Sequence, residues 1–270
     1  MSSANPSSAP EVTISVRDVV THYGKREVLH GINLDIHRGE TMVILGGSGS
    51  GKSTLIRHLV GLEKVTSGSI HVLGSNICGI SERDFNKIRR KIGMSFQGSA
   101  LFNSLTIGEN VALPLREHTE LEDSTIQIMT RIKLEQVGLA GFENYFPSQL
   151  SGGMKKRAGV ARALAMDPEI LLFDEPSAGL DPVIAAGVDD LIIKLKSAFQ
   201  MTIVVVTHEL ASAFLIADRI TVLDKGYLIS TGTRDEIHDS THPRVRQFLD
   251  RVPDPEAEGA EAYLMAGSSG

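Results

Sequence analysis

The residues from Gly46 to Thr54 have the types and spacing of a loop that binds phosphate groups. They read GGSGSGKST, fit the pattern G-x-x-x-x-G-K-[ST] and follow the apolar run Thr41–Leu45. Glycines let the backbone curl so that its N–H groups point at phosphate oxygens, and the start of the following helix favours anions. The predicted phosphate-binding residues are Gly46, Gly47, Ser48, Gly49, Ser50, Gly51, Lys52, Ser53 and Thr54.

Two side chains of this loop predict which ligand it takes. We expect Lys52 to bring a positive charge to the β- and γ-phosphates, and the Ser53 hydroxyl to bind Mg²⁺. The alternative is a glycine- and serine-rich turn that matches the pattern by chance. The apolar run before the loop and the amphipathic stretch Leu55–Leu59 after it argue against that alternative. The loop therefore predicts binding of a nucleoside triphosphate.

A pair of acids follows a second apolar run, Ile170–Phe173. Asp174 and Glu175 would lie at the carboxyl end of a parallel strand, beside the phosphate loop. There we expect Asp174 to hold Mg²⁺, directly or through water, and Glu175 to act as general base on the attacking water. Two solvated carboxylates at a strand end are the alternative, which the following run Pro176–Pro182 makes improbable.

A second anion site is predicted where Leu150–Met154 opens a basic helix. Ser151, Gly152 and Gly153 would expose N–H groups at the start of that helix. Taken alone, Ser-Gly-Gly before a helix is an ordinary turn and cap. Two anion sites in one chain need not serve the same nucleotide.

The elements that must position these residues predict an α/β fold. Continuous apolar runs at Glu169–Phe173 and Thr202–Val206 are typical of central parallel strands covered on both faces. Residues 12–39 alternate in the manner of half-buried strands, with Tyr23 in a polar loop segment. The region from Gln97 to about residue 150 looks helical, and in it Ile128, Met129 and Ile132 fall on one helical face.

Length and composition limit the class of protein. A chain of 270 residues with 41% hydrophobic residues can bury a full core as one large domain or two joined lobes. The net charge of −6 argues against a dedicated nucleic-acid binder. The single cysteine, Cys78, cannot form an internal disulfide, which fits a reducing compartment. The chain shows neither a secretory signal nor an apolar run long enough for a membrane helix.

We predict three parts along the chain. Residues 1–10 form a disordered tail, and residues 11–250 form the nucleotide-binding domain, with a helical subdomain at about 98–165. Residues 251–270 are rich in acids and lose the core pattern, so we expect a flexible extension there.

Taken in order, these motifs resemble those of the ATP-binding cassette (ABC) ATPases over roughly Val12 to Asp250. The matching features are the phosphate loop, Gln97, Leu150–Met154, Asp174-Glu175, Ser177–Asp181 and His208. The resemblance implies a P-loop NTPase core of mainly parallel sheet, with an N-terminal antiparallel β subdomain and an α-helical subdomain. It also implies ATP hydrolysis with Mg²⁺.

The resemblance also implies a head-to-tail homodimer. In it, each ATP lies between the phosphate loop of one subunit and Ser151, Gly152 and Gly153 of the other.

The same resemblance implies roles for single residues. Tyr23 matches the aromatic residue that stacks on adenine, and Asp181 matches the loop that adjoins the nucleotide. Catalysis is then assigned to Glu175, His208 and Gln97, and metal binding to Ser53, Gln97 and Asp174. His208 matches the residue that contacts the γ-phosphate, and Gln97 the residue that links the metal site to a transmembrane partner.

Two residues depart from the usual pattern of the ABC ATPases. Met154 replaces the usual Gln of the signature, and Gly47 lies where many relatives have Pro or another residue. Neither is assigned to metal or γ-phosphate chemistry, so we expect hydrolysis to survive.

Shorter segments resemble the Mce-linked lipid-transport ATPases, the group that includes the Mla phospholipid system. They are Ser99–Phe102, Pro114–Thr119, the Met154 signature and Arg244–Asp250. This resemblance implies a transmembrane permease dimer in the inner membrane and a periplasmic Mce-domain lipid-binding protein; some such systems add a small STAS-domain subunit. The chain would then lie peripherally on the cytoplasmic face of the inner membrane, with the permease contacting the region around Ser99–Phe102.

Two other functions stay open. An ABC importer ATPase for another small solute shares every catalytic motif. A non-transport ABC ATPase acting on DNA or ribosomes fits less well, because those proteins carry coiled-coil insertions or two cassettes. This chain has one cassette, no heptad insertion and an acidic balance, and we predict no nucleic-acid partner.

Overall fold

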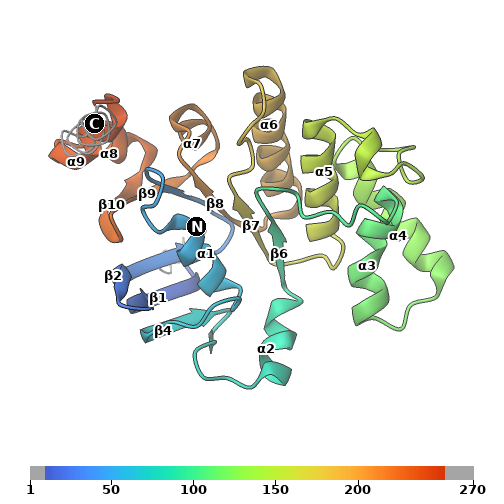
Figure 1. Ribbon diagram of the computed structural model, residues 1–270, viewed down its shortest axis with the longest axis horizontal. Helices are drawn as coiled ribbons and strands as arrows, with labels where there is room; N and C mark the ends of the chain where they lie inside the picture. The colour runs from blue at the N-terminus through green and yellow to red at the C-terminus, as the bar shows by residue number, and fades with distance from the viewer. Residues whose placement is uncertain (1–9, 253–270) are drawn as a thin grey trace, which may run out of the picture.

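The computed structural model describes residues 10–252 and contains two sheets with helices around them (Figure 1). The larger sheet of this part of the chain has the strand order β10-β9-β3-β8-β7-β6. Its strands are β3 (Thr41–Leu45), β6 (Ile92–Ser95), β7 (Ile170–Asp174), β8 (Thr202–Thr207), β9 (Arg219–Asp224) and β10 (Tyr227–Thr233). All neighbouring pairs are parallel except β9 and β10, which form an antiparallel hairpin.

The central strands form where the apolar runs predicted them, because both of their faces are covered. Every residue of β3, β7 and β8 is buried. Val43 and Leu45 belong to one hydrophobic cluster, whereas Met42 and Ile44 belong to a second. Because side chains alternate along a strand, these clusters lie on opposite faces of the sheet.

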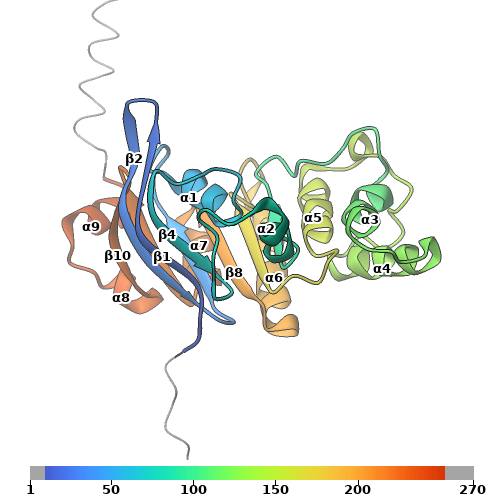
Figure 2. The ribbon, with the colours of Figure 1, turned by 90° about the horizontal axis from the view of Figure 1, so that it is seen from below.

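The smaller, antiparallel sheet has the order β2-β1-β4-β5 and packs beside the N-terminal part of the core (Figure 2). Its strands are β1 (Val12–Tyr23), β2 (Arg26–His37), β4 (Ser67–Val72) and β5 (Ser75–Asn76). The prediction of a loop at Tyr23 was wrong. Tyr23 is the last residue of β1 and pairs with Arg26 across a tight turn, in which Gly24 takes a φ of 61°.

Helices complete the described part of the chain. They are α1 (Lys52–Leu59), α2 (Glu82–Arg89), α3 (Ile107–His118), α4 (Asp123–Gln136), α5 (Gly152–Ala163), α6 (Pro182–Phe199), α7 (Leu210–Ile216), α8 (Arg234–His238) and α9 (Pro243–Leu249). Figures 1 and 2 both show α3 and α4 at the end of the molecule away from the antiparallel sheet, with α5 between them and the core.

The helical region differs from its prediction in two respects. Within the region that looks helical in the sequence, the chain between the end of α4 and Ser151 holds turns and one short 3₁₀ helix, Pro147–Gln149. Ile128 and Ile132 are exposed on α4, whereas Met129 packs against the core cluster. The spacing predicted the helix but not which of its sides is covered.

The ends of the chain were predicted to be a tail and an acidic extension. Both predictions fall almost entirely on residues outside the described range of 10–252. Within that range, the helices are too short or too polar to cross a membrane.

Candidate active site

The phosphate loop connects β3 to α1 and lies against the end of β9. A Cβ atom on Gly46 would lie 2.2 Å from the carbonyl oxygen of Leu223, so only glycine fits there without movement. Gly51 caps the start of α1 with a φ of 103°. Lys52 then turns back, and its Nζ donates hydrogen bonds to the carbonyls of Gly46 at 2.8 Å and Gly47 at 2.9 Å. The ammonium therefore lies inside the curl of the loop.

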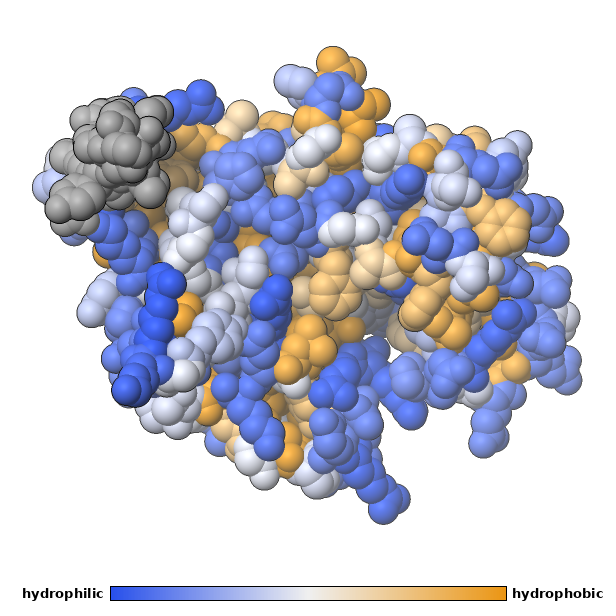
Figure 3. Space-filling model, in the orientation of Figure 1, coloured by the Kyte–Doolittle hydropathy of each residue, from blue (hydrophilic) through white to orange (hydrophobic). Residues whose placement is uncertain are grey.

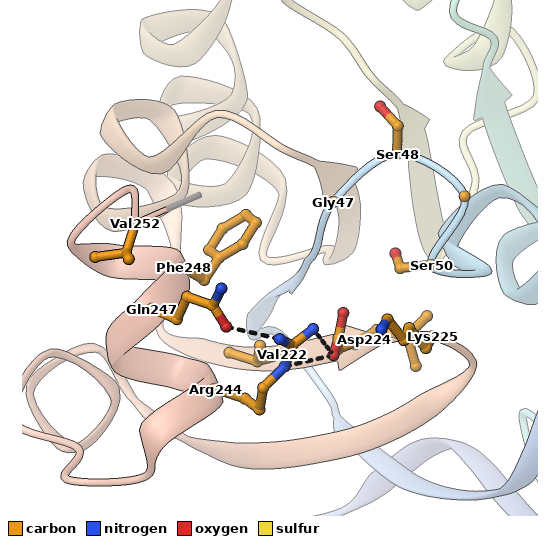
Figure 4. Close-up of a pocket in the computed structure, with 12 residues that line it drawn as sticks. Gly47, Ser48, Ser50, Val222, Asp224, Lys225, Arg244, Gln247, Phe248 and Val252 are labelled. Atoms are coloured by element: carbon orange, nitrogen blue, oxygen red, sulfur yellow. Dashed lines mark hydrogen bonds and ion pairs between the residues drawn. The ribbon is translucent and has the colours of Figure 1, made fainter. Parts of the chain in front are cut away.

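The outer side of the loop borders a pocket that the C-terminal helix closes (Figure 4). Arg244, on α9, donates to Asp224 Oδ2 from Nε at 2.9 Å and from Nη2 at 2.6 Å. The same guanidinium donates from Nη1 to Gln247 Oε1 at 2.6 Å. Asp224 ends β9, so this contact fixes α9 beside the phosphate loop.

The predicted metal ligands Ser53 and Asp174 meet. Ser53 is the second residue of α1, and Asp174 is the last residue of β7. The Ser53 hydroxyl donates a hydrogen bond to Asp174 Oδ1 at 3.1 Å. Hydroxyl and carboxylate oxygens are hard ligands, and Mg²⁺ in nucleotide sites uses one or two such protein ligands together with phosphates and waters. These two residues fit that requirement.

Glu175 lies between two predicted partners of the γ-phosphate. Its Oε1 is 3.6 Å from Lys52 Nζ, and its Oε2 is 2.9 Å from His208 Nδ1. The carboxylate is buried, whereas the imidazole is half-exposed. Glu175 has a φ of 50°, an uncommon backbone conformation for a residue other than glycine, and its N–H donates to Val206 O at 2.9 Å. The structure thus brings together a carboxylate, an ammonium group and an imidazole.

Burial makes the isolated charges of this site unfavourable. It raises the pKa of Asp174, and the neighbouring Glu175 charge adds to that rise, against a lowering by the Ser53 hydrogen bond. Burial also lowers the pKa of Lys52, which the Glu175 carboxylate opposes. A cation bound beside Asp174 would offset the burial penalty on its charge.

The signature residues and Asp181 cap neighbouring helices. Ser151 Oγ accepts from Met154 N at 3.3 Å at the start of α5, and Asp181 Oδ1 accepts from Val183 N and Ile184 N at the start of α6. A Cβ on Gly153 would lie 2.4 Å from Ile184 Cγ2, so the two helix starts are in contact. Within residues 10–252, no hydrogen bond joins Ser151 or Asp181 to the phosphate loop of the same chain.

Tyr23 contacts α1, and Gln97 follows β6, the strand beside β7. The exposed Tyr23 donates its hydroxyl to Glu63, and that oxygen is 3.5 Å from Thr54 Oγ1 on α1. The Gln97 side chain is exposed just after β6. The roles of all these residues stay predictions.

Sequence reasoning missed Lys156. This lysine of α5 is 7% exposed, and its Nζ donates to the carbonyls of Gln97 at 2.5 Å and Glu175 at 3.1 Å. The sequence signal is the basic run Lys155–Arg157, which by itself indicates only a basic helix.

The fold and this site define a nucleotide-binding ATPase with a P-loop core. Residues 29–178 match the family model described as ABC transporter. The chain belongs to the ABC transporter family and is an ATPase subunit of it.

Relatives and solved structures agree with this assignment. The chain is 42% identical over 238 residues to the probable ribonucleotide transport ATP-binding protein mkl of Mycobacterium leprae, covering 88% of this chain and 69% of that protein. It is 39% identical over 241 residues to the intermembrane phospholipid transport system ATP-binding protein MlaF of Escherichia coli, covering 89% and 90%. A dimeric ATP-binding cassette in a post-hydrolysis state, bound to ADP and Pi, superposes with a TM-score of 0.76 at 33% identity, covering 82% and 98%. These structural neighbours confirm the predicted fold class.

Proposed function

We propose that this chain hydrolyses ATP to power phospholipid transport across a bacterial envelope. The observation that carries the proposal is the similarity to MlaF, which extends over 90% of that protein. The segments Pro114–Thr119 and Arg244–Asp250, which resemble lipid-transport ATPases, support the same substrate.

The catalytic part of the proposal follows the contacts of the site. Ser53 and Asp174, together with Gln97, would hold Mg²⁺, and Glu175 would take a proton from the attacking water. His208 contacts the γ-phosphate from the other side of Glu175. Tyr23 stacks on the adenine. The geometry supports these roles because it gathers Lys52, Ser53, Asp174, Glu175 and His208 around one end of the sheet.

The proposal includes a head-to-tail dimer, in which Ser151, Gly152, Gly153 and Asp181 face the nucleotide of the partner. The start of α6 supports this, because Val183 there is 80% exposed and Ile184 beside it is exposed too. Apolar side chains gather over α6 at the top of Figure 3. The dimeric cassette that superposes on this chain gives further support.

The permease would dock on the helical part of the chain, at about residues 98–165. A groove between α2, β6, α3 and α5 is lined by Arg89, Met94, Phe102, Pro114 and Met166. It combines an exposed phenylalanine with basic side chains, which suits an amphipathic segment of a membrane protein. The chain would lie peripherally on the cytoplasmic face of the inner membrane, with an Mce-domain carrier in the periplasm and, as in some related systems, a STAS-domain subunit.

A second candidate is transport of ribonucleotides or another small solute, because the relative mkl is named as a probable ribonucleotide transport protein. Purification of the tagged chain from native membranes in mild detergent, followed by mass spectrometry of proteins and lipids, separates the candidates. A permease with an Mce-domain protein and phospholipid would support the proposal. A permease with a receptor for a soluble solute would replace the substrate, and DNA proteins or ribosomes without a permease would overturn the transport role.

A further inference from the structure

Lys156 joins two segments that carry predicted site residues. β6 and β7 are neighbouring parallel strands, paired from Ile92–Ile170 to Ser95–Phe173. Gln97 and Glu175 follow these strands, and Lys156 Nζ bonds to the backbone carbonyl of each. The lysine therefore bridges the segments that follow the two strands, from a helix that packs beside β6.

This arrangement differs from an ordinary ion pair. Burial lowers the pKa of Lys156, and the charges of Glu175 and Asp174 oppose that effect. The ammonium nevertheless donates to backbone oxygens, and no carboxylate contact within 4.0 Å is found for it in residues 10–252. A buried charge is costly unless its donors are used. These two bonds hold the backbone at Gln97 and Glu175, whereas a simple ion pair would hold only side chains.

The hydrogen bond from Lys156 helps to hold the backbone conformation of Glu175. With a φ of 50°, Glu175 has a conformation that costs free energy unless surrounding bonds hold it. Its N–H donates to Val206 O, and its carbonyl accepts from Lys156 Nζ and, at 3.2 Å, from Ala178 N, so both of its backbone groups are fixed. The side chain then points between Lys52 and His208.

The same face of α5 holds the segment after Gln97. Ser99 and Ala100 have φ values of 61° and 48°, and their carbonyls accept from the Arg162 guanidinium at 3.0 Å and 2.7 Å. Gly159, between the two basic residues, packs directly against Ser99, whose carbonyl oxygen would lie 3.2 Å from an added Cβ. The segment from Gln97 to Ala100 is thus fixed to α5 at three successive positions of one helix face.

We propose that Lys156 is a positioning residue for ATP hydrolysis, which holds Gln97 and Glu175 in a fixed relation through their backbones. The inference rests on the proposed roles of Gln97 in metal binding and Glu175 as base. The bonds of Lys156 go to the carbonyls of Gln97 and Glu175 and not to the phosphate loop. Its loss would therefore misplace Glu175 while leaving the phosphate loop intact.

Substitution with methionine tests this, because methionine keeps the length of the side chain and removes its donors. In the purified full-length chain, Lys156→Met is expected to lower kcat for ATP at least about tenfold, with the KM and Kd for ATP changed less than about threefold. Lys156→Arg retains donors and charge, and is expected to restore most of kcat. A kcat near that of the parent in Lys156→Met would overturn the proposal.

A matched control separates positioning from stability. Lys133 on α4 is also buried and bonds to Asp167, away from the strand ends. Lys133→Met is expected to lower the melting temperature without lowering kcat per folded molecule. An equal loss of kcat in both methionine variants would overturn the inference. Should Lys156→Met not fold, Lys156→Leu, which also lacks donors, is compared with Lys156→Arg, and equal kcat values in those two would overturn the inference.

The test also distinguishes failure of this inference from failure of the proposed catalytic roles. Glu175→Gln removes the base directly. Normal turnover in Glu175→Gln would remove the base assignment, and with it the reason for positioning. Lost turnover in Glu175→Gln with normal turnover in Lys156→Met would overturn only the role of Lys156.

Discussion

The Ser53 hydroxyl donates a hydrogen bond of 3.1 Å to Asp174 Oδ1, across a sequence separation of 121 residues. Parallel pairing through β3, β8 and β7 brings this about, because it places the carboxyl ends of β3 and β7 at one edge of the sheet. One residue enters from the loop after β3 and the other from the end of β7. The order of the strands therefore positions the two oxygen atoms that we propose as Mg²⁺ ligands.

Glu175→Gln is expected to abolish most turnover while ATP still binds. The amide keeps the shape of the carboxylate but cannot take a proton from water, and a positioned general base contributes roughly 10²–10⁴-fold. Steady-state phosphate release and equilibrium ATP binding measure the two effects, and the dimer is expected to persist with ATP. Glu169→Gln, at an exposed ion pair with Lys91, is the control. Near-normal hydrolysis in Glu175→Gln would remove this residue as the base.

Lys52→Ala is expected to weaken ATP binding itself, by at least about tenfold, because a charge in the curl of the phosphate loop is lost. Titration with a fluorescent ATP analogue gives the Kd. Lys87→Ala removes an exposed lysine of α2 and serves as the control. An unchanged Kd in Lys52→Ala would count against the phosphate-loop assignment.

Asp189→Asn is expected to stabilise the protein at neutral pH. Asp189 is buried between α6 and α7, its Oδ2 accepts from Ser212 Oγ at 2.7 Å, and its Oδ1 has no hydrogen-bond partner among the described residues. Burial raises the pKa of this carboxyl above its usual 3.8, and the Glu209 charge adds to the rise. A raised pKa means that the stability from this group is full below pH 3.8 and is lost as the pH rises through the folded-state value.

The amide in Asp189→Asn does not ionise, so its melting temperature should exceed that of the parent by a few degrees at pH 7 to 8. The difference should shrink toward pH 4. Thermal melting across that range measures it. Asp190→Asn changes the adjacent, exposed carboxylate and is expected to show no such trend. A constant difference at all pH values would contradict the explanation from burial.

Gly46→Ala is expected to destabilise the fold by roughly 1–3 kcal/mol, because its methyl group would overlap the Leu223 carbonyl, which is backbone and cannot turn away. Gly47→Ala is the matched control, since a Cβ there meets nothing within 4 Å. Chemical unfolding of both variants tests the difference. Equal stabilities would show that the loop shifts freely against β9.

The sequence predicted those elements of the fold whose pattern lies within one short segment. Continuous apolar runs predicted β3, β7 and β8, because a strand covered on both faces is apolar at most of its positions. The glycines and Lys52 predicted the loop between β3 and α1. The residue pattern also predicted α5, which Ser151 caps.

The parts that depend on distant neighbours were not predicted. Tyr23 was placed in a loop, because the polar segment around it gave no sign that β1 extends so far along β2 with several register shifts. Lys156 was not predicted as part of the site, because its burial depends on strand ends that lie 59 residues before it and 19 residues after it. The use of Asp181 Oδ1 as a helix cap was likewise not predicted, although Asp followed by Pro182 is a sequence signal for the start of a helix.

The two hydrophobic clusters share the central sheet, and this affects how the protein unfolds. Leu171 and Phe173 belong to one cluster, whereas Ile170 and Leu172 of the same strand belong to the other. The cluster that contains Phe173 also includes Ile107 and Leu134 of the helical part. Neither cluster can be exposed to water without disrupting strands that the other requires. We therefore expect the helical part and the nucleotide site to be lost together when the described part of the chain melts.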